Sequence, residues 1–189
     1  NMTEDETLLA EVSKSVMQAS ANSQNEGYEA GKAVDGDTST IWHTQWEPES
    51  TERPHILTID LGQSVLVDSI KITPRQDMST GRITEGRIYA GNDLEEMETA
   101  AEFTGGNPGE ISLWYRQARY IQIESLAGSD KNTAIAEVDV RTYDRGYAVL
   151  SKAYDDAESF LGNAQTGSEV GQYPKEEKDA FEAEVAGFA

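Results

Sequence analysis

The stretch Lys32-Ala33-Val34-Asp35-Gly36-Asp37-Thr38-Ser39-Thr40-Ile41-Trp42-His43-Thr44 decides how the rest of this chain is interpreted. Oxygen-bearing side chains crowd positions 35–40, and apolar residues flank them. A tight turn at Gly36 can direct several oxygens inward, and hard cations such as calcium bind about six to eight oxygens. The spacing is not that of an EF-hand, which needs a later bidentate glutamate. Taken alone, the stretch fits either a cation-binding loop or an ordinary Asp-Gly turn.

Composition and charge narrow the classes of partner. The chain has 189 residues, with 35 acidic against 15 basic side chains and a formal charge of −20. Such a surface repels phosphate backbones and anionic lipids, so we expect neither nucleic acid nor an acidic membrane as a partner. The chain has no cysteine, which excludes disulfides, thiol nucleophiles and thiolate metal sites. Its two histidines nearly exclude a multi-histidine zinc site.

The sequence predicts neither a membrane span nor a leader. No apolar run approaches the roughly 20 residues needed to cross a bilayer. The first residues, Asn1-Met2-Thr3, lack the basic and apolar segments of a signal peptide. The length suits one domain of ordinary size with a small appendage.

Apolar residues alternate with polar ones in several short segments before Asp144. This period of two is typical of half-buried strands. Turn-rich stretches separate the segments, and strand–helix alternation is missing, so we expect an all-β antiparallel sandwich or barrel over residues 1–143. The alternation is clear at residues 55–61, 67–73, 120–124 and 136–140, and weaker at residues 87–90 and 112–115.

The apolar period lengthens after Asp144. Three- and four-residue steps indicate a helix, Gly162 is a plausible stop, and Pro174 suits a second helix start. We therefore expect residues 144–189 to form a short α-helical hairpin that serves as a linker or spacer module. The two apolar stripes are Tyr147, Leu150, Tyr154, Ala157 and Leu161, and then Phe181, Val185 and Phe188.

Several motifs in order resemble the F5/8 type C, or discoidin, domains, and within that group the family 32 carbohydrate-binding modules. The resemblance covers roughly residues 12–143 and implies a jelly-roll β-sandwich of the galactose-binding-like fold. The motifs are Ala33-Val34-Asp35-Gly36-Asp37, Thr40-Ile41-Trp42-His43-Thr44, the strand ending in Asp60-Leu61-Gly62, Ile70-Lys71-Ile72-Thr73-Pro74-Arg75, Gly81-Arg82-Ile83 and Ala136-Glu137-Val138.

The resemblance also implies a structural calcium ion. It assigns carboxylates from Asp35 and Glu137, the hydroxyl of Thr40, and carbonyl oxygens from Lys32, Asp37, Thr40 and Ala136. Such an ion would tie the last strand to a loop about 100 residues earlier, which restrains the chain as a crosslink does. In the alternative interpretation, Asp35 caps a turn and Glu137 is a surface carboxylate.

The same resemblance assigns carbohydrate binding to His43, Trp46 and Arg75, with Glu26 as a further contributor. A sugar needs polar donors for its hydroxyls and an aromatic platform for its C–H face. Thr80 stands where galactose binders often carry asparagine, and residues 129–133 include no aromatic, so the predicted platform is one-sided.

The same side chains have alternative, structural interpretations. His43 could bond a loop carbonyl, Trp46 could pack against a proline, and Arg75 could pair with Asp77 or Glu85. We expect Trp42 to lie in the core, and Trp114 and Tyr115 to be sandwich residues.

These residues predict a binding module rather than an enzyme. The sequence contains no nucleophile elbow, P-loop or Rossmann fingerprint. The resemblance implies a monomeric, extracellular or cell-surface module within a larger glycan-active protein, which it targets to galactose- or N-acetylgalactosamine-terminated glycans. The alternative is a protein-interaction or spacer discoidin module that binds no sugar.

Overall fold

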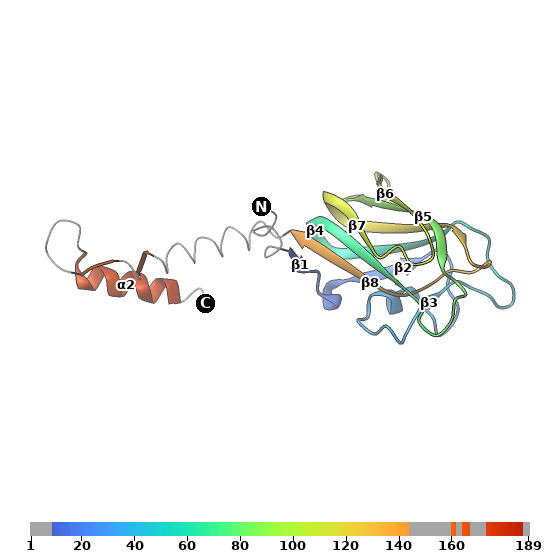
Figure 1. Ribbon diagram of the computed structural model, residues 1–189, viewed down its shortest axis with the longest axis horizontal. Coiled ribbons are helices and arrows are strands. Elements are labelled where there is room, and N and C mark those ends of the chain that lie inside the picture. Colours follow the sequence, from blue (N-terminus) through green and yellow to red (C-terminus); the bar gives the residue numbers. More distant parts are fainter. Residues whose placement is uncertain (1–8, 144–159, 162–163, 167–172, 187–189) are drawn as a thin grey trace. The chain divides into compact units, whose positions relative to one another are not determined.

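A computed structural model describes residues 9–143, 160–161, 164–166 and 173–186 (Figure 1). Contacts between Cα atoms divide the chain into two compact units, residues 1–143 and residues 144–189. Most of the first predicted helix of the hairpin, residues 147–159, lies outside the described residues.

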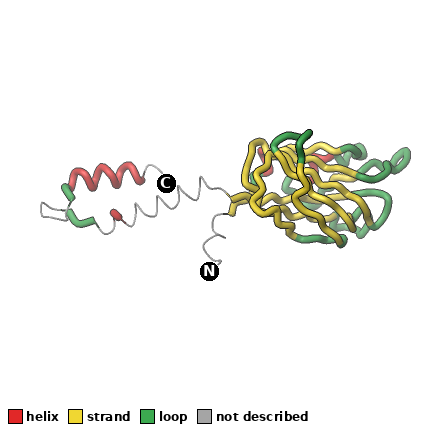
Figure 2. Tube along the Cα trace, turned by 90° about the horizontal axis from the view of Figure 1, so that it is seen from above, coloured by secondary structure: helices red, strands yellow, loops and turns green. Residues whose placement is uncertain are grey.

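The first unit is an antiparallel β-sandwich, as the alternating segments predicted (Figure 2). Its strands pair in the order β1-β8-β4-β7-β5-β6, with β2 beside β4 and β3 beside β8. Two short 3-10 helices, η2 and η3, lie between the first strands. The elements are β1 (Leu9–Glu11), η2 (Lys14–Val16), β2 (Gln18–Ala21), η3 (Ala30–Val34), β3 (Trp42–His43), β4 (His55–Pro74), β5 (Ile83–Gly91), β6 (Glu98–Thr104), β7 (Glu110–Gly128) and β8 (Ala134–Tyr143).

Two long strands, β4 and β7, contribute to both layers of the sandwich. Residues 55–60 of β4 pair with the second half of β7, and residues 57–60 also pair with β2. After a register shift between Asp60 and Val65, the rest of β4 pairs with β8 and with the first half of β7. The segments 55–61 and 67–73, expected as separate strands, are therefore two halves of one strand. Gly62 interrupts the alternation at φ +80°, but pairing resumes beyond it.

The core fills the space between the two layers. Its side chains come from alternate positions of the strands, which is why the period of two was visible in the sequence. Trp42 is fully buried, as expected, and its indole Nε1 donates to the Ser23 carbonyl at 3.0 Å. Other fully buried side chains are Leu57, Ile59, Leu61, Ile70, Ile88, Leu113, Ile121, Ile123 and Ile135.

Trp114 does not belong to this core, so its expected place in the sandwich is wrong. It is 80% exposed, and Tyr115 is 46% exposed. Both residues have left-handed backbone angles, φ 54° and φ 60°, in the first half of β7. This conformation breaks the alternation of β7 and directs the Trp114 side chain away from the interior.

The second unit contains α2 (Lys175–Ala186). The Pro174 carbonyl accepts hydrogen bonds from the backbone of Glu177 and Lys178, both at 3.1 Å, consistent with Pro174 at the helix start. The Phe160 ring meets Tyr173 and Phe181 edge-on, with centroids 5.2 Å and 5.9 Å away. Among the described residues, no helix has the length and apolarity that a bilayer crossing demands.

Replacing Gly81 by alanine tests the packing of the loop against β8. Gly81 has φ +76°, and a Cβ there would lie 2.8 Å from Ala134 Cβ and 3.0 Å from Ala134 N. We expect Gly81→Ala to lower the free energy of unfolding by about 1–3 kcal/mol in urea titrations. Gly31→Ala is the control, because its Cβ meets nothing within 4 Å, and should change stability by less than about 0.5 kcal/mol. Equal losses in both variants would contradict this packing.

Candidate functional site

Strand pairing places the predicted sugar-binding residues at one end of the sandwich. Trp42 and His43 of β3 pair with Ile135 and Ala134 at the start of β8. Pro74, the last residue of β4, also pairs with Ile135. The segments that carry Trp46 and Arg75 directly follow β3 and β4, so they emerge at this end.

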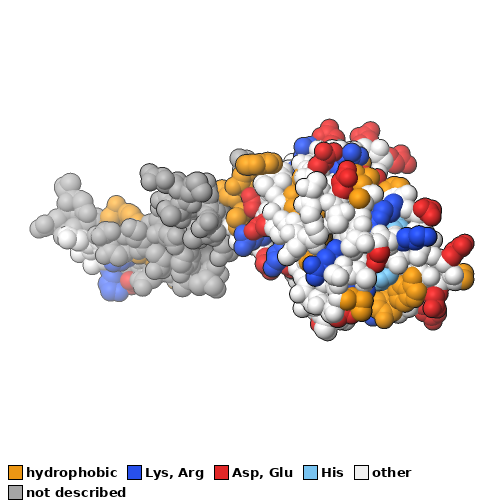
Figure 3. Space-filling view, turned by 45° about the vertical axis from the view of Figure 1, so that its right-hand side comes forward, with side chains coloured by type: hydrophobic (Ala, Val, Ile, Leu, Met, Phe, Trp, Pro, Cys, Tyr) orange, Lys and Arg blue, Asp and Glu red, His pale blue; other side chains and the backbone are white. Residues whose placement is uncertain are grey.

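His43, Trp46 and Tyr28 form an aromatic cluster. The His43 and Trp46 ring centroids are 4.5 Å apart, and the Trp46 and Tyr28 centroids are 5.0 Å apart, both in edge-to-face geometry. Tyr28 is 38% exposed, whereas His43 is only 7% exposed. The face of the molecule in Figure 3 shows a histidine beside a hydrophobic patch, with charged side chains around them. The cluster therefore combines a polar ring atom with apolar ring surface.

Tyr28 was missed by the sequence interpretation, which found only a one-sided platform. Its position depends on two backbone hydrogen bonds to β3: Asn25 N donates to the His43 carbonyl at 3.0 Å, and His43 N donates to the Tyr28 carbonyl at 3.1 Å. The Asn25-Glu26-Gly27-Tyr28 turn, with Gly27 at φ +81°, was the only signal available in the sequence.

The tautomer of His43 follows from its contact with a carbonyl. Nδ1 lies 2.7 Å from the Thr44 carbonyl oxygen, which can only accept, so Nδ1 carries the proton. Burial lowers the pKa of His43 below its ordinary value, and the charge of Arg75 lowers it further, against the opposing effects of the Thr44 bond and Asp130. The ring is therefore neutral at pH 7, with Nε2 as a hydrogen-bond acceptor.

Arg75 forms a bidentate ion pair with Asp77, one of the two structural partners that the sequence analysis named for it. Arg75 Nε and Nη2 donate to the two carboxylate oxygens, each at 2.8 Å. This bond lowers the pKa of Asp77, which keeps it ionised. Among the described residues, no acceptor contacts Arg75 Nη1. The pairing fixes one edge of the guanidinium and leaves donors at its other end for a ligand.

Arg53 and Asp130 fix the loop between β7 and β8. Arg53 Nη2 donates to the Asn132 carbonyl at 2.6 Å and to the Asp130 carbonyl at 3.1 Å. The Asp130 carboxylate accepts from Gly81 N at 3.2 Å and from Asn132 N at 2.9 Å. These bonds join the loop to the Gly81 turn that follows Arg75.

Glu26 is exposed, and among the described residues its carboxylate makes no hydrogen bond or ion pair. Its neighbour Asn25 accepts from Trp46 N at 3.4 Å through its side-chain oxygen. The structure thus puts Glu26 in the turn that carries Tyr28, and no hydrogen bond or ion pair joins its side chain to His43 or Arg75 among the described residues.

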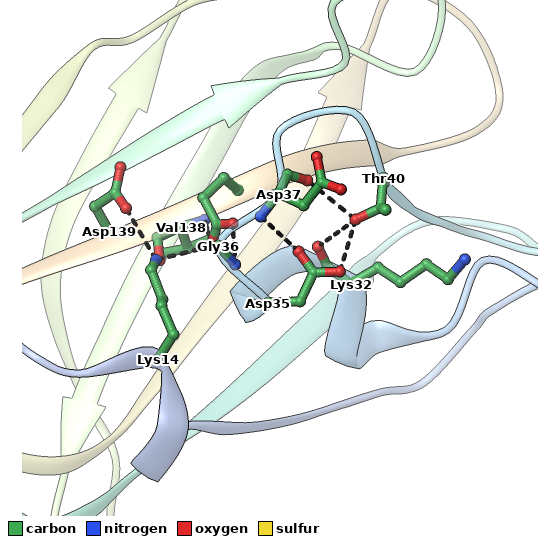
Figure 4. Close-up of polar contacts among 9 residues, drawn as sticks. Lys14, Lys32, Asp35, Gly36, Asp37, Thr40, Val138 and Asp139 are labelled. Carbon is green, nitrogen blue, oxygen red and sulfur yellow. Dashed lines mark hydrogen bonds and ion pairs between the residues drawn. The ribbon is translucent and has the colours of Figure 1, made fainter.

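The predicted cation loop gathers oxygens around Thr40 (Figure 4). The Thr40 hydroxyl lies 2.7 Å from Asp35 Oδ2, 3.0 Å from the Asp37 carbonyl and 3.4 Å from the Lys32 carbonyl. One hydroxyl proton cannot satisfy three acceptors, whereas a cation can face all of them. These four residues therefore fit a hard cation such as calcium.

Glu137 closes the loop from the side of β8. Its Oε2 accepts from Gly36 N at 2.8 Å, although the two residues are 101 positions apart. Ala136, the neighbouring residue of β8, is fully buried. Among the described residues, no three His, Cys, Asp or Glu side chains converge in a metal-binding group. The predicted calcium ligands include only two carboxylates, those of Asp35 and Glu137. The other ligands are carbonyl and hydroxyl oxygens.

The family model of the F5/8 type C domain matches residues 18–138. This chain belongs to that family. It is 28% identical over 132 residues to a sialidase of Micromonospora viridifaciens and 27% identical over 137 residues to a galactose oxidase of Gibberella zeae. These matches cover 65% and 68% of this chain, and the chain spans only 20% of the length of each curated relative.

Solved structures agree with this assignment. The family 32 carbohydrate-binding module of Clostridium perfringens NanJ, solved in complex with galactose, superposes with a TM-score of 0.65 at 33% identity. The match covers 70% of this chain and 98% of that module. The C. perfringens module CpGH89CBM32-5, with a TM-score of 0.63 at 24% identity over 69% of this chain and 99% of that one, shares the fold. The predicted family and jelly-roll fold are confirmed, and the family domain is a non-catalytic, ancillary module.

The pH dependence of His43 can be tested directly. Because its pKa in the folded protein lies below 6.5, the unfolded chain binds the proton more tightly. Stability from this residue is therefore full above pH 6.5 and is lost as the pH falls below that value toward the folded pKa. We expect an NMR titration midpoint below 6.5 and ¹⁵N shifts of an Nδ1-protonated ring at pH 7. A midpoint at or above 6.5 would contradict the burial of the ring.

Proposed function

We propose that the F5/8 type C domain binds a terminal galactose-type sugar at the surface formed by His43, Trp46, Tyr28 and Arg75. The observation that carries this proposal is the aromatic cluster, in which the neutral imidazole of His43 lies 4.5 Å from the Trp46 ring and 6.3 Å from the Tyr28 ring, measured between centroids. Rings of this kind can cover the C–H face of a sugar.

Hydrogen bonding at the site suits neighbouring hydroxyls. His43 Nε2 accepts one hydroxyl proton, while the free end of the Arg75 guanidinium donates to hydroxyl oxygens. Asp77 holds the guanidinium in place through two bonds of 2.8 Å, which reduces the side-chain entropy lost on binding. Both kinds of hydrogen-bonding partner are therefore available before the ligand arrives.

A structural calcium ion belongs to the proposal. Lys32, Asp35, Asp37 and Thr40 would hold it on the loop, with Ala136 and Glu137 on the β8 side. The ion would bind the oxygens of Lys32, Asp35 and Asp37 that now face the single proton of the Thr40 hydroxyl. The loop leads directly into β3, so its closure would also fix the backbone of His43.

The relatives support a role for the module within a larger protein. The NanJ module was solved with galactose, and curated relatives include a sialidase and an N-acetyl-alpha-D-galactosamine deacetylase of Flavonifractor plautii. We propose that this chain belongs to a larger extracellular protein acting on glycans, which the module directs to galactose- or N-acetylgalactosamine-terminated substrates. Weak single-site binding gains from repeated attachment on such surfaces.

Substitution of the polar contacts tests the sugar site. His43→Ala and Arg75→Ala each remove a hydrogen-bonding group, so we expect at least a tenfold loss of affinity for galactose or N-acetylgalactosamine by calorimetry. Trp114→Ala is the control, because it removes an exposed aromatic outside the site and should leave affinity unchanged. A wild-type domain that binds no glycan on an array would instead favour a protein-interaction or spacer module.

Removal of calcium tests the ion. We expect the wild-type domain to have a higher Tm in millimolar calcium than in EDTA, because an ion that binds only the folded state stabilises it. Asp35→Asn should abolish most of that difference, since it removes one of two charged ligands. Asp93→Asn, in a distant exposed turn, is the matched control and should retain the full difference. An identical Tm with and without calcium in the wild type would reject the ion.

A further inference from the structure

Lys14 reaches from η2 to the predicted cation site, although no motif included it. Its ammonium Nζ lies 2.8 Å from Glu137 Oε1, 2.6 Å from the Val138 carbonyl and 2.9 Å from Asp139 Oδ1 (Figure 4). An ammonium group has three protons, so these three oxygens saturate it.

Burial makes this contact necessary for Glu137. The Glu137 side chain is only 3% exposed, and a buried carboxylate is costly unless it is paired and hydrogen-bonded. Lys14 supplies the charge through Oε1, and Gly36 N supplies a hydrogen bond through Oε2 at 2.8 Å. The two oxygens of Glu137 thus have partners from the chain itself, one on each side of the clip between β8 and the loop.

We propose that Lys14 is the resident cation of this clip. It positions Glu137 against Gly36 and neutralises it whether or not a divalent ion is bound. The fold then keeps its closure between β8 and the 35–40 loop in the absence of calcium. The inference about calcium affinity below rests on the proposed calcium site, whereas the inference about closure does not.

The Lys14 ammonium also weakens the binding of any cation at the proposed calcium site. It occupies Glu137 Oε1, and its positive charge repels a divalent cation bound on the other side of the same carboxylate. Lys14 therefore lowers the affinity for calcium and raises the stability of the calcium-free domain. Without Lys14, Glu137 Oε1 would lose its ammonium partner and be open to calcium, and the domain would depend on that ion more strongly.

Lys14 further joins the N-terminal segment to the clip. Met17 N donates to the Lys14 carbonyl at 3.2 Å, and Val12 N donates to the Val140 carbonyl at 2.9 Å. Loss of the ammonium contact should therefore loosen residues 12–17 as well as Glu137.

The experiment compares Lys14→Met with Lys131→Met by thermal unfolding in EDTA and in calcium. Lys131 is the matched control, because it is an exposed lysine that belongs to neither the proposed calcium site nor the proposed sugar site. In EDTA we expect Lys14→Met to lower Tm by roughly 5–10 °C more than Lys131→Met. In calcium we expect a larger Tm rise for Lys14→Met than for the wild type.

The outcomes separate the two proposals. Equal Tm values for the two variants in EDTA would overturn the inference about Lys14. If Lys14→Met lowers Tm in EDTA but its calcium-induced rise in Tm equals that of the wild type, Lys14 is an ordinary ion-pair partner of Glu137. That result would overturn the inference that Lys14 weakens calcium binding. No calcium response in any variant would reject the calcium site, while the EDTA comparison would still decide closure. If Lys14→Met does not fold, Asp139→Asn removes one of the three contacts and should show a smaller loss in the same direction.

Discussion

The contact between Glu137 and the 35–40 loop is the constraint on which the binding end of the domain depends. It brings together residues 101 positions apart in a chain without cysteine. Closing so long a loop costs conformational entropy, which the contact must offset through a buried, charge-compensated carboxylate. Lys14 and Gly36 share that compensation from opposite sides, so the N-terminal segment, the loop and β8 stabilise one another.

The proposed sugar-binding surface depends on this closure and on the pairing of β3 with β8. The loop passes directly into β3, where Trp42 fills the core and His43 lies at the surface end. Two backbone bonds then attach the Tyr28 turn to β3, and Arg53 fixes the neighbouring loop through its carbonyls. Rigid support of this kind allows small side-chain groups to be presented at fixed spacing, which hydroxyl recognition requires.

The sequence predicted the parts of this structure that depend on local pattern or on ordered motifs. Alternation revealed the strands, and the Asp35-Gly36-Asp37 turn marked the oxygen-rich loop. The sequence could not show that β4 continues past Gly62, because the strand resumes there only through its pairing with β7 and β8. Lys14 looks like any surface lysine until its distance to Glu137 is known, and Tyr28 joins the cluster only through tertiary hydrogen bonds. Trp114 is a large apolar residue in a predicted strand, which is typical of a core position. Its exposure follows from its left-handed backbone, which the sequence does not show.

The course of β8 determines how the domain would carry mechanical load. The ten-residue strand begins at Ala134, the partner of His43, and ends at Tyr143, so it runs about 30 Å from the proposed sugar-binding end to the point where the domain ends. Tension between a bound glycan and the chain after Tyr143 would act along β8. Because the hydrogen bonds to β4 lie perpendicular to the strand, they would be sheared together rather than opened one by one. The topology thus suits a tether that is pulled from both ends.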